Sequence, residues 1–122
     1  ALARGAWVLS DRFTDATYAY QVGGRGVAER KFAALEDWVQ EGLQPDRTLL
    51  FDVSVATAQA RLHDTRILDR FEREASDFHQ RVREAYHQRA AQYPERIRLI
   101  ASDVPMDDVR AQILVALSDL LA

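Results

Sequence analysis

The sequence predicts an α/β fold in which helices cover a parallel sheet. Three short apolar runs, at residues 6–10, 48–53 and 97–101, have the length and composition of strands. Segments with apolar residues at helical spacing separate these runs. Strands that alternate with helices usually pair in parallel, because each helix carries the chain back across the sheet. The run at 48–53 is largely apolar, which is typical of a strand buried on both faces.

Five helices are predicted around these strands. Bounded by glycine, proline or short polar residues, they span residues 15–21, 27–41, 55–62, 69 or 71 to 93, and 105 onward. Ser54 is the expected N-cap of the third helix. We expect Leu35, Trp38 and Val39 to form a core stripe or a helix–helix contact on the second helix. The inner faces of the last two helices are expected at Phe71, Ala75, Phe78, Val82 and Ala85, and at Val109, Ile113, Leu117 and Leu120. The solvated face of the fourth helix is expected at Arg73, Arg81, Arg83 and Arg89.

Composition limits the function classes. The 122 residues carry a net charge of −3, which argues against a general nucleic-acid binder or a basic membrane-surface protein. The sequence has no cysteine, and His63, His79 and His87 are not spaced to chelate a metal. No run approaches the roughly 18–20 consecutive apolar residues of a membrane span, and no secretory signal opens the sequence. We therefore expect a cytoplasmic protein without nucleic-acid or membrane partners.

Polar residues follow the first predicted strand directly. Ligands of open α/β sheets bind beyond the carboxyl ends of the strands, where Asp11 and Arg12 stand. The planar guanidinium of Arg12 suits phosphate oxygens. Asp11 either holds Arg12 in place or faces a hydrated metal ion. The alternative is an ordinary surface ion pair at a strand end.

The longer stretch Asp11–Gly26 closely resembles the signature of bacterial thymidylate kinases. It combines Asp-Arg-aromatic, Ala-Tyr-Gln and a glycine-rich segment that is expected to break the chain, with Val22 where the family usually has its first glycine. Residues 45–53 and 68–72 are similar to two further family motifs. The resemblance covers the whole chain, which corresponds to the C-terminal three-fifths of the sequences in this family. It implies a P-loop nucleoside monophosphate kinase fold.

Residues 1–122 are expected to form a single, incomplete domain with a lid at about 62–70. The sequence contains no Gly-x-x-x-x-Gly-Lys-Ser/Thr, so the phosphate loop and the first strands are expected upstream of Ala1. Residues 1–5 are consistent with this, because they look like the end of a helix capped by Gly5. We expect this chain alone to be inactive.

The resemblance implies an enzyme that transfers a phosphoryl group from ATP to dTMP with Mg²⁺, giving dTDP and ADP in dTTP synthesis. It also implies a homodimer. The implied catalytic residues are Arg12, Arg66 and Arg70, with Asp11 near the metal. The implied substrate-binding residues are Asp11, Arg12, Thr17, Tyr20, Gln21 and Glu72, and the loop beside adenine holds Ser102 and Asp103. Tyr20 would crowd the 2′ position of the sugar and so disfavour ribonucleotides.

Other interpretations remain open for the residues and for the protein. Thr17 could be an ordinary helix residue, Tyr20 a core aromatic, and Arg70 a partner of Glu74 across one helical turn. The protein could be a non-catalytic nucleotide-binding or dimerisation module, or a related deoxynucleoside kinase, which also has Asp-Arg after a strand. Ala-Tyr-Gln and Gly-Gly-Arg-Gly favour the monophosphate kinase. A phosphate loop in the upstream sequence would favour an enzyme over the non-catalytic module.

Overall fold

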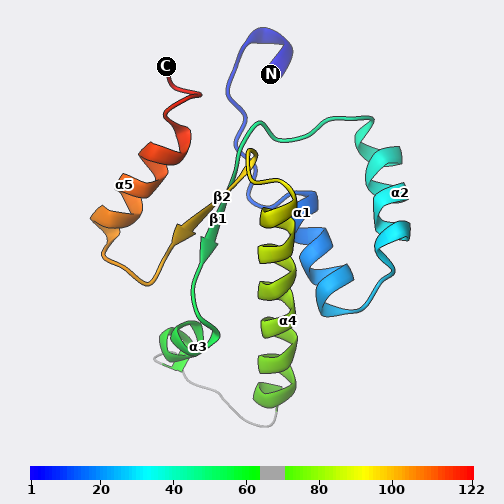
Figure 1. Ribbon diagram of the computed structural model, residues 1–122, viewed down its shortest axis with the longest axis vertical. Coiled ribbons are helices and arrows are strands. Elements are labelled where there is room, and N and C mark those ends of the chain that lie inside the picture. Colours follow the sequence, from blue (N-terminus) through cyan, green and yellow to red (C-terminus); the bar gives the residue numbers. More distant parts are fainter. Residues whose placement is uncertain (64–70) are drawn as a thin grey trace.

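The computed structural model describes residues 1–63 and 71–122, and it has the expected α/β character. Two parallel strands, β1 (Thr48–Asp52) and β2 (Ile97–Ala101), lie at the centre of the fold (Figure 1). Thr48 pairs with Ile97 at one end of the ladder and Asp52 with Ala101 at the other. Both strands begin where the sequence predicted them to begin.

Helices cover the strands from two sides. The helical elements are η1 (Leu2–Arg4), α1 (Thr14–Thr17), the π-helix η2 (Tyr18–Gly24), α2 (Glu29–Gln40), α3 (Val55–His63), α4 (Phe71–Gln92) and α5 (Met106–Leu117). In Figure 1, α5 and α4 lie on opposite sides of β2, and α1 and α2 lie beyond α4. The backbone N–H of Thr57 donates to Ser54 Oγ at 3.0 Å, which confirms the predicted N-cap of α3.

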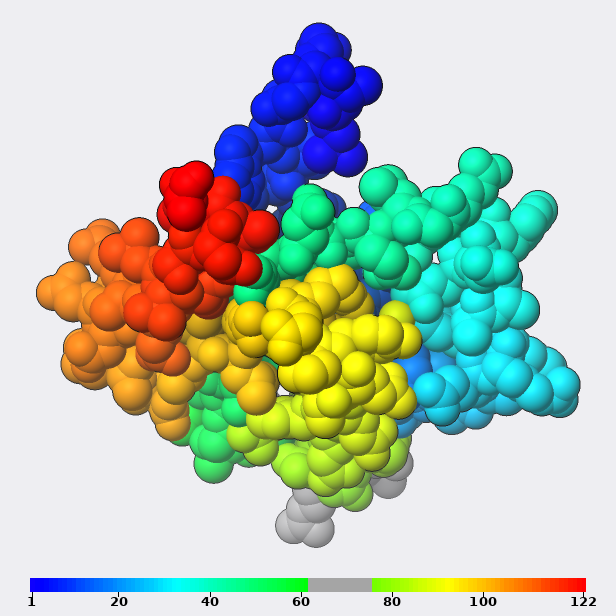
Figure 2. Space-filling view, turned by 45° about the horizontal axis from the view of Figure 1, so that its top comes forward, coloured from blue at the N-terminus to red at the C-terminus, as the bar shows by residue number. Residues whose placement is uncertain are grey.

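The first predicted strand is wrong. Residues 6–10 form neither strand nor helix, and Leu9 and Trp7 are 95% and 64% exposed. A strand is held by ladder hydrogen bonds to a neighbour, and no described residue pairs with this segment. The N-terminal segment therefore projects from the body of the molecule (Figure 2). Gly5, in the left-handed conformation at φ 71°, ends η1 as predicted.

Two small cores stabilise the fold. The first lies between η2, α2 and α4, and its buried members are Tyr18, Ala19, Phe32, Val82 and Ala85. The second lies between β2 and α5, and its buried members are Ile100, Val109 and Ala116. Phe78 packs against the first core and Ile113 against the second. The predicted inner faces of both helices are therefore confirmed at these positions, while the side chains of Phe71 and Ala75 lie outside the described part of the chain.

The expectation that Gly23 and Gly24 interrupt the helix is wrong, because both residues belong to η2. A Cβ on Gly23 would collide with Ala85 Cβ, and one on Gly24 would lie 2.5 Å from the Phe78 ring. The two glycines therefore allow η2 to approach α4 closely. Val22 is helical and partly buried, so its β-branched side chain does not restrict a loop.

Two expected burials are not found. Leu35, Trp38 and Val39 on α2 are 54%, 77% and 66% exposed, and Phe51 of β1 is 53% exposed. Phe32 is the one buried residue of α2, so the rest of this helix faces away from the first core. On β1, Leu49 packs against the second core but Phe51 is not covered by the described residues. No helix among residues 1–63 and 71–122 is long and apolar enough to cross a membrane.

Candidate functional site

The structure brings Arg12 and Tyr20 together. The Arg12 guanidinium carbon lies 5.2 Å from the centroid of the Tyr20 ring, a cation–π distance. Arg12 has a positive φ of 66°, which is unusual for a residue with a side chain. Ser10 Oγ donates to the Arg12 carbonyl oxygen at 2.8 Å and supports this conformation. Strained backbone of this kind clusters at functional sites.

The other predicted residues of the signature are mostly exposed. Asp11 and Thr17 are both exposed, and Asp11 forms no ion pair with Arg12 or with any other described residue. Gln21 is half-buried, and its Oε1 accepts a hydrogen bond from Arg25 Nη1 at 3.2 Å. Asp11 and Thr17 are therefore free to face a ligand, whereas Gln21 is engaged with the glycine-rich segment.

A groove of about 1220 Å³ opens beside this site. Its walls come from residues 5–13, from β1, from one face of α4 and from the end of α5. Asp11, Arg12, Asp52, Arg83 and Tyr86 line it. The groove therefore joins the exposed arginine of the signature to the carboxyl end of β1.

Asp52 at the end of β1 is held by α4. Arg83 donates from Nε and Nη2 to its two carboxylate oxygens, each at 2.8 Å, and His87 Nε2 lies 3.1 Å from Oδ2 without hydrogen-bond alignment. The hydrogen bonds from Arg83 lower the pKa of Asp52 against the opposing effect of burial. Arg83 does not belong to a solvated face. The sequence did not predict this pair, although Asp52 follows directly on an apolar run.

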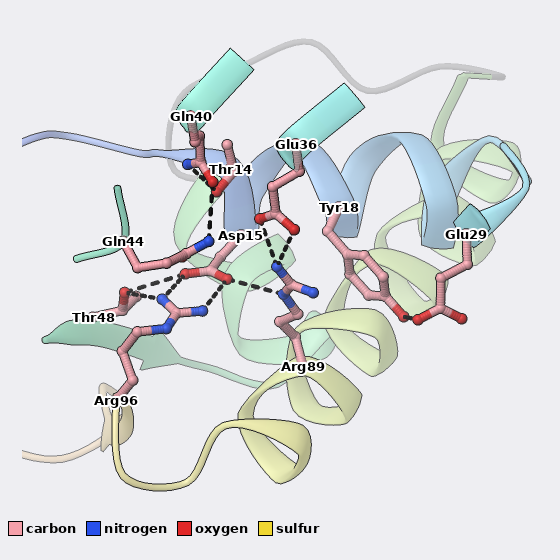
Figure 3. A network of polar contacts seen from close by, with 10 residues as sticks. All are labelled: Thr14, Asp15, Tyr18, Glu29, Glu36, Gln40, Gln44, Thr48, Arg89 and Arg96. Atoms are coloured by element: carbon pink, nitrogen blue, oxygen red, sulfur yellow. Dashed lines mark hydrogen bonds and ion pairs between the residues drawn. The ribbon is translucent and has the colours of Figure 1, made fainter. Parts of the chain in front are cut away.

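A buried ion network is centred on Asp15, three residues after Arg12 in the sequence (Figure 3). Asp15 of α1 is 4% exposed, and both of its oxygens are engaged. Arg96 donates at 2.6 Å to Oδ2 and at 2.8 Å to Oδ1, and Arg89 donates to Oδ1 at 3.1 Å. Thr48 Oγ1 also donates to Oδ2 at 3.2 Å. Desolvation is the largest single effect and would raise the pKa of Asp15, but the hydrogen bonds and positive charges of Arg96 and Arg89 together hold this pKa below its ordinary value.

Arg89 is the second centre of this network. Its side chain is 6% exposed, and its Nη2 donates to both oxygens of Glu36 on α2 at 2.7 and 2.9 Å. Its guanidinium carbon also lies within 5.6 Å of the ring centroids of Tyr18, Phe32 and Tyr93. The prediction that Arg89 is solvated is therefore wrong. The spacing of Val82, Ala85 and Arg89 placed it on the buried stripe, but its charge favoured the opposite interpretation.

The loop after β2 is tied to the end of β1. The Ser102 backbone N–H donates to the Asp52 carbonyl oxygen at 2.8 Å, and the Ser102 carbonyl oxygen accepts from Arg61 Nη2 at 2.8 Å. Asp103 is exposed. Arg66 and Arg70 lie outside the described residues, as does the side chain of Glu72, whose backbone belongs to α4.

The described side chains do not form a metal cage. Among residues 1–63 and 71–122 there is no group of three or more His, Asp or Glu residues that could hold a metal ion. Near the Arg12–Tyr20 pair, Asp11 offers a single exposed carboxylate. A divalent ion would therefore need other ligands here, such as the phosphate oxygens of a nucleotide.

The parallel strands, the long helix between them and an exposed arginine beside a groove are features of the α/β domains that bind nucleotides. Comparison with known proteins narrows this class. The chain belongs to the thymidylate kinase family, whose sequence pattern matches residues 1–113.

Named relatives agree with this assignment. A thymidylate kinase of Chromobacterium violaceum is 54% identical over 121 residues, which cover 99% of this chain and 57% of the relative. One of Thiobacillus denitrificans is 57% identical over 98% of this chain and 59% of the relative. One of Bordetella pertussis is 56% identical over 100% of this chain and 59% of the relative. The chain thus spans less than three-fifths of the length of these relatives.

Proposed function

We propose that the protein containing this chain is a thymidylate kinase, which transfers the γ-phosphoryl group of ATP to dTMP and releases dTDP and ADP for dTTP synthesis. The observation that carries the proposal is the Arg12–Tyr20 pair, in a chain of this family and within a signature that the family shares. In this proposal, residues 1–122 are part of one larger domain. The lid lies within this chain at about residues 62–70, and the phosphate loop lies in the rest of the domain.

Arg12 acts on the phosphate side of the acceptor. Phosphoryl transfer needs alignment and charge neutralisation more than covalent participation by the protein. The exposed guanidinium of Arg12 offers several donors in one plane, and its cation–π contact with Tyr20 orients that plane. Charge on the transferring group increases toward the transition state, so the contact with Arg12 strengthens there. Arg66 and Arg70 of the lid are proposed to assist from the donor side.

The end of α1 and the start of η2 recognise the nucleoside. Tyr20 is half-buried, and its ring packs edge-on against Phe78 of α4, with 6.0 Å between the ring centroids. A ring held in this way cannot move aside for an additional 2′ hydroxyl, so Tyr20 selects deoxyribose. Thr17 is exposed on the same helical segment and offers a hydroxyl to the base. Gln21 and Glu72 complete the proposed acceptor site.

ATP is the proposed donor and is accompanied by Mg²⁺. Nucleotide-bound Mg²⁺ commonly uses one or two protein carboxylates beside phosphate oxygens and waters, and exposed Asp11 fits this requirement. When bound, Mg²⁺ would neutralise charge on the phosphate oxygens. Ser102 and Asp103 lie beyond β2 and are proposed to border the adenine. The protein is proposed to act in the cytoplasm as a homodimer that buries Leu35, Trp38 and Val39 of α2.

A coupled ADP-release assay on the intact protein tests this function. We expect turnover that requires both dTMP and ATP, and no turnover from the 122-residue chain alone because it contains no phosphate-loop sequence. Arg12→Ala should lower kcat by roughly 10²-fold or more, and lysine should rescue it only partly. Arg110→Ala is the matched control, since Arg110 is exposed and its one ion pair with the described residues is to Asp107. Near-normal kcat in Arg12→Ala would contradict the assignment.

A second arm of the assay tests sugar selection. Tyr20→Ala should weaken but retain phosphorylation of dTMP, and it should narrow the preference for dTMP over the corresponding ribonucleotide. An unchanged ratio of the two kcat/KM values would show that Tyr20 does not select the sugar.

A further inference from the structure

We propose that Asp15, Arg89 and Arg96 are positioning residues that fix the Arg12–Tyr20 pair in its working geometry. This inference rests on the proposed function, because it assigns these residues a task in the same site. Asp15 borders the groove, but both of its oxygens are engaged by Thr48, Arg89 and Arg96, so we assign none of the three a direct contact with substrate. They act through α1 and η2, the two consecutive helical segments that follow Arg12 and contain Tyr20.

The network holds the start of α1 in several directions at once. Asp15 is three residues after Arg12, and its two oxygens bind Arg96, immediately before β2, Thr48 at the start of β1, and Arg89 of α4. Elements that are far apart in the sequence therefore meet at one carboxylate (Figure 3). The neighbouring Thr14 Oγ1 also accepts from Gln40 Nε2 of α2 at 3.0 Å. The helix that follows Arg12 thus has little freedom to rotate or slide.

The backbone between Arg12 and Asp15 makes this restraint consequential. The positive φ of Arg12 persists only where the surrounding structure enforces it, because a residue with a side chain disfavours that region. On its N-terminal side, the described support is the hydrogen bond from Ser10 Oγ. On its C-terminal side, the support comes through Asp15. A looser Asp15 would allow Arg12 to relax toward negative φ and turn its side chain away from Tyr20.

The other end of the helical segment is fixed independently. Tyr20 packs against Phe78, and the Gly24 carbonyl oxygen accepts from Arg81 Nη2 at 3.2 Å, so α4 holds the end of η2 as well. Arg89, further along α4, holds Asp15 in the preceding helix α1. The relative position of Arg12 and Tyr20 therefore depends on both attachments to the same helix.

An ion network suits this task better than an apolar contact. A bidentate guanidinium–carboxylate pair is directional, whereas apolar side chains can repack at similar energy. The formal charges also balance, since Arg89 and Arg96 face Asp15 and Glu36. The network therefore defines an orientation in the interior without leaving a net charge there.

Arg96→Lys in the intact protein tests the proposal, because it keeps the charge but removes the bidentate fork. We expect kcat for dTMP to fall about tenfold, with KM for ATP within about twofold of the parent, because misplacement of a reacting group lowers the chemical step. We also expect the Arg12 Nε–Hε NMR signal to shift as the guanidinium leaves the Tyr20 ring. The Arg12→Lys variant has no Arg12 Nε–Hε group, so the signal that disappears in its spectrum is assigned to Arg12.

Arg47→Lys is the matched control. Arg47 immediately precedes Thr48 and its side chain is 7% exposed, but it binds Asp119 and not Asp15. It should change stability without moving the Arg12 signal or kcat. If Arg96→Lys does not fold, Thr48→Val removes a weaker bond to Asp15 and should shift the same signal by a smaller amount.

The two proposals fail in different ways. A parent protein without dTMP phosphorylation would refute the proposed function, and the NMR signal would still report on positioning. An unmoved signal in a folded Arg96→Lys protein would overturn the positioning role. So would an unchanged kcat in that variant when the parent is active.

Discussion

Asp15→Asn should cost the intact protein about 3 kcal/mol of unfolding free energy. Asparagine keeps the size of the side chain, but it loses the negative charge and places an amide donor near the Arg96 guanidinium. Glu36 still neutralises Arg89, so one buried positive charge is left without its partner. Removing one member of a buried ion pair typically costs about 3–5 kcal/mol. The lower end applies here because the Arg96 side chain, at 14% exposed, can still reach some water.

Urea unfolding followed by far-UV circular dichroism measures this loss directly. The expected change corresponds to a fall in Tm of about 6–12 °C for a domain of roughly 150–250 residues. Asp107→Asn is the control, since Asp107 pairs with Arg110 at the surface, and its side chain is 92% exposed. It should leave the urea midpoint nearly unchanged.

A double variant separates charge from shape. If the uncompensated charge of Arg96 causes the loss, Asp15→Asn combined with Arg96→Met should be less destabilised than the sum of the single variants. A loss below about 1 kcal/mol for Asp15→Asn, the range of exposed pairs, would refute the argument that this network is a buried and cooperative unit.

Three further predictions concern packing, pH and assembly. Gly24→Ala should destabilise the protein by about 1–3 kcal/mol in urea unfolding, because the added Cβ would overlap the Phe78 ring. Adding Phe78→Leu to this variant should recover part of the loss, and additive losses in the double variant would contradict the close packing of Gly24 against Phe78. The pKa values of Asp15 and Asp52 are lowered in the folded state, so their contribution to stability is present above the unfolded value of about 3.9 and is lost as pH falls through the folded values. Urea midpoints from about pH 6 down to pH 3 should therefore fall less steeply in Asp15→Asn than in the parent. Parallel curves would show that Asp15 does not contribute to the pH dependence of stability. Trp38→Glu should convert the proposed homodimer to monomer in light scattering coupled to gel filtration, since Trp38 is 77% exposed on the proposed interface; a dimeric variant would place the interface elsewhere.

Local patterns predicted the elements whose stability is local. Residues 97–101 and 55–62 were found nearly as expected, since apolar runs, caps and breakers act over a few neighbouring residues. Residues 6–10 have an equally good strand pattern, but a strand also needs a partner, and a pattern does not specify which backbone lies beside it. This is why the same kind of evidence succeeded in one place and failed in the other.

The candidate site shows the same division. The juxtaposition of Arg12 and Tyr20 follows from a signature within one short segment, and the sequence predicted both residues for the site. Asp15, Arg89 and Arg96 were not predicted, because the ion network connects positions that are 74 and 81 residues apart. Charge on a helix favours solvent on average, and only the three-dimensional fold reveals that Arg89 meets two carboxylates and three aromatic rings.

The widened turn of η2 also limits how the signature can change in length. The Arg25 N–H donates to the Tyr20 carbonyl oxygen five residues earlier, at 3.1 Å, so this hydrogen bond of η2 spans one more residue than the four-residue bond of an α-helix. Loss of a single residue between Tyr18 and Gly24 could be absorbed, because ordinary winding with one residue fewer covers nearly the same rotation about the axis. A one-residue insertion that is wound as ordinary helix would instead turn every later side chain by about 100°, so that Gly23 and Gly24 would no longer face Ala85 and Phe78. Insertions should therefore be tolerated far less well here than a one-residue deletion that removes the widened turn.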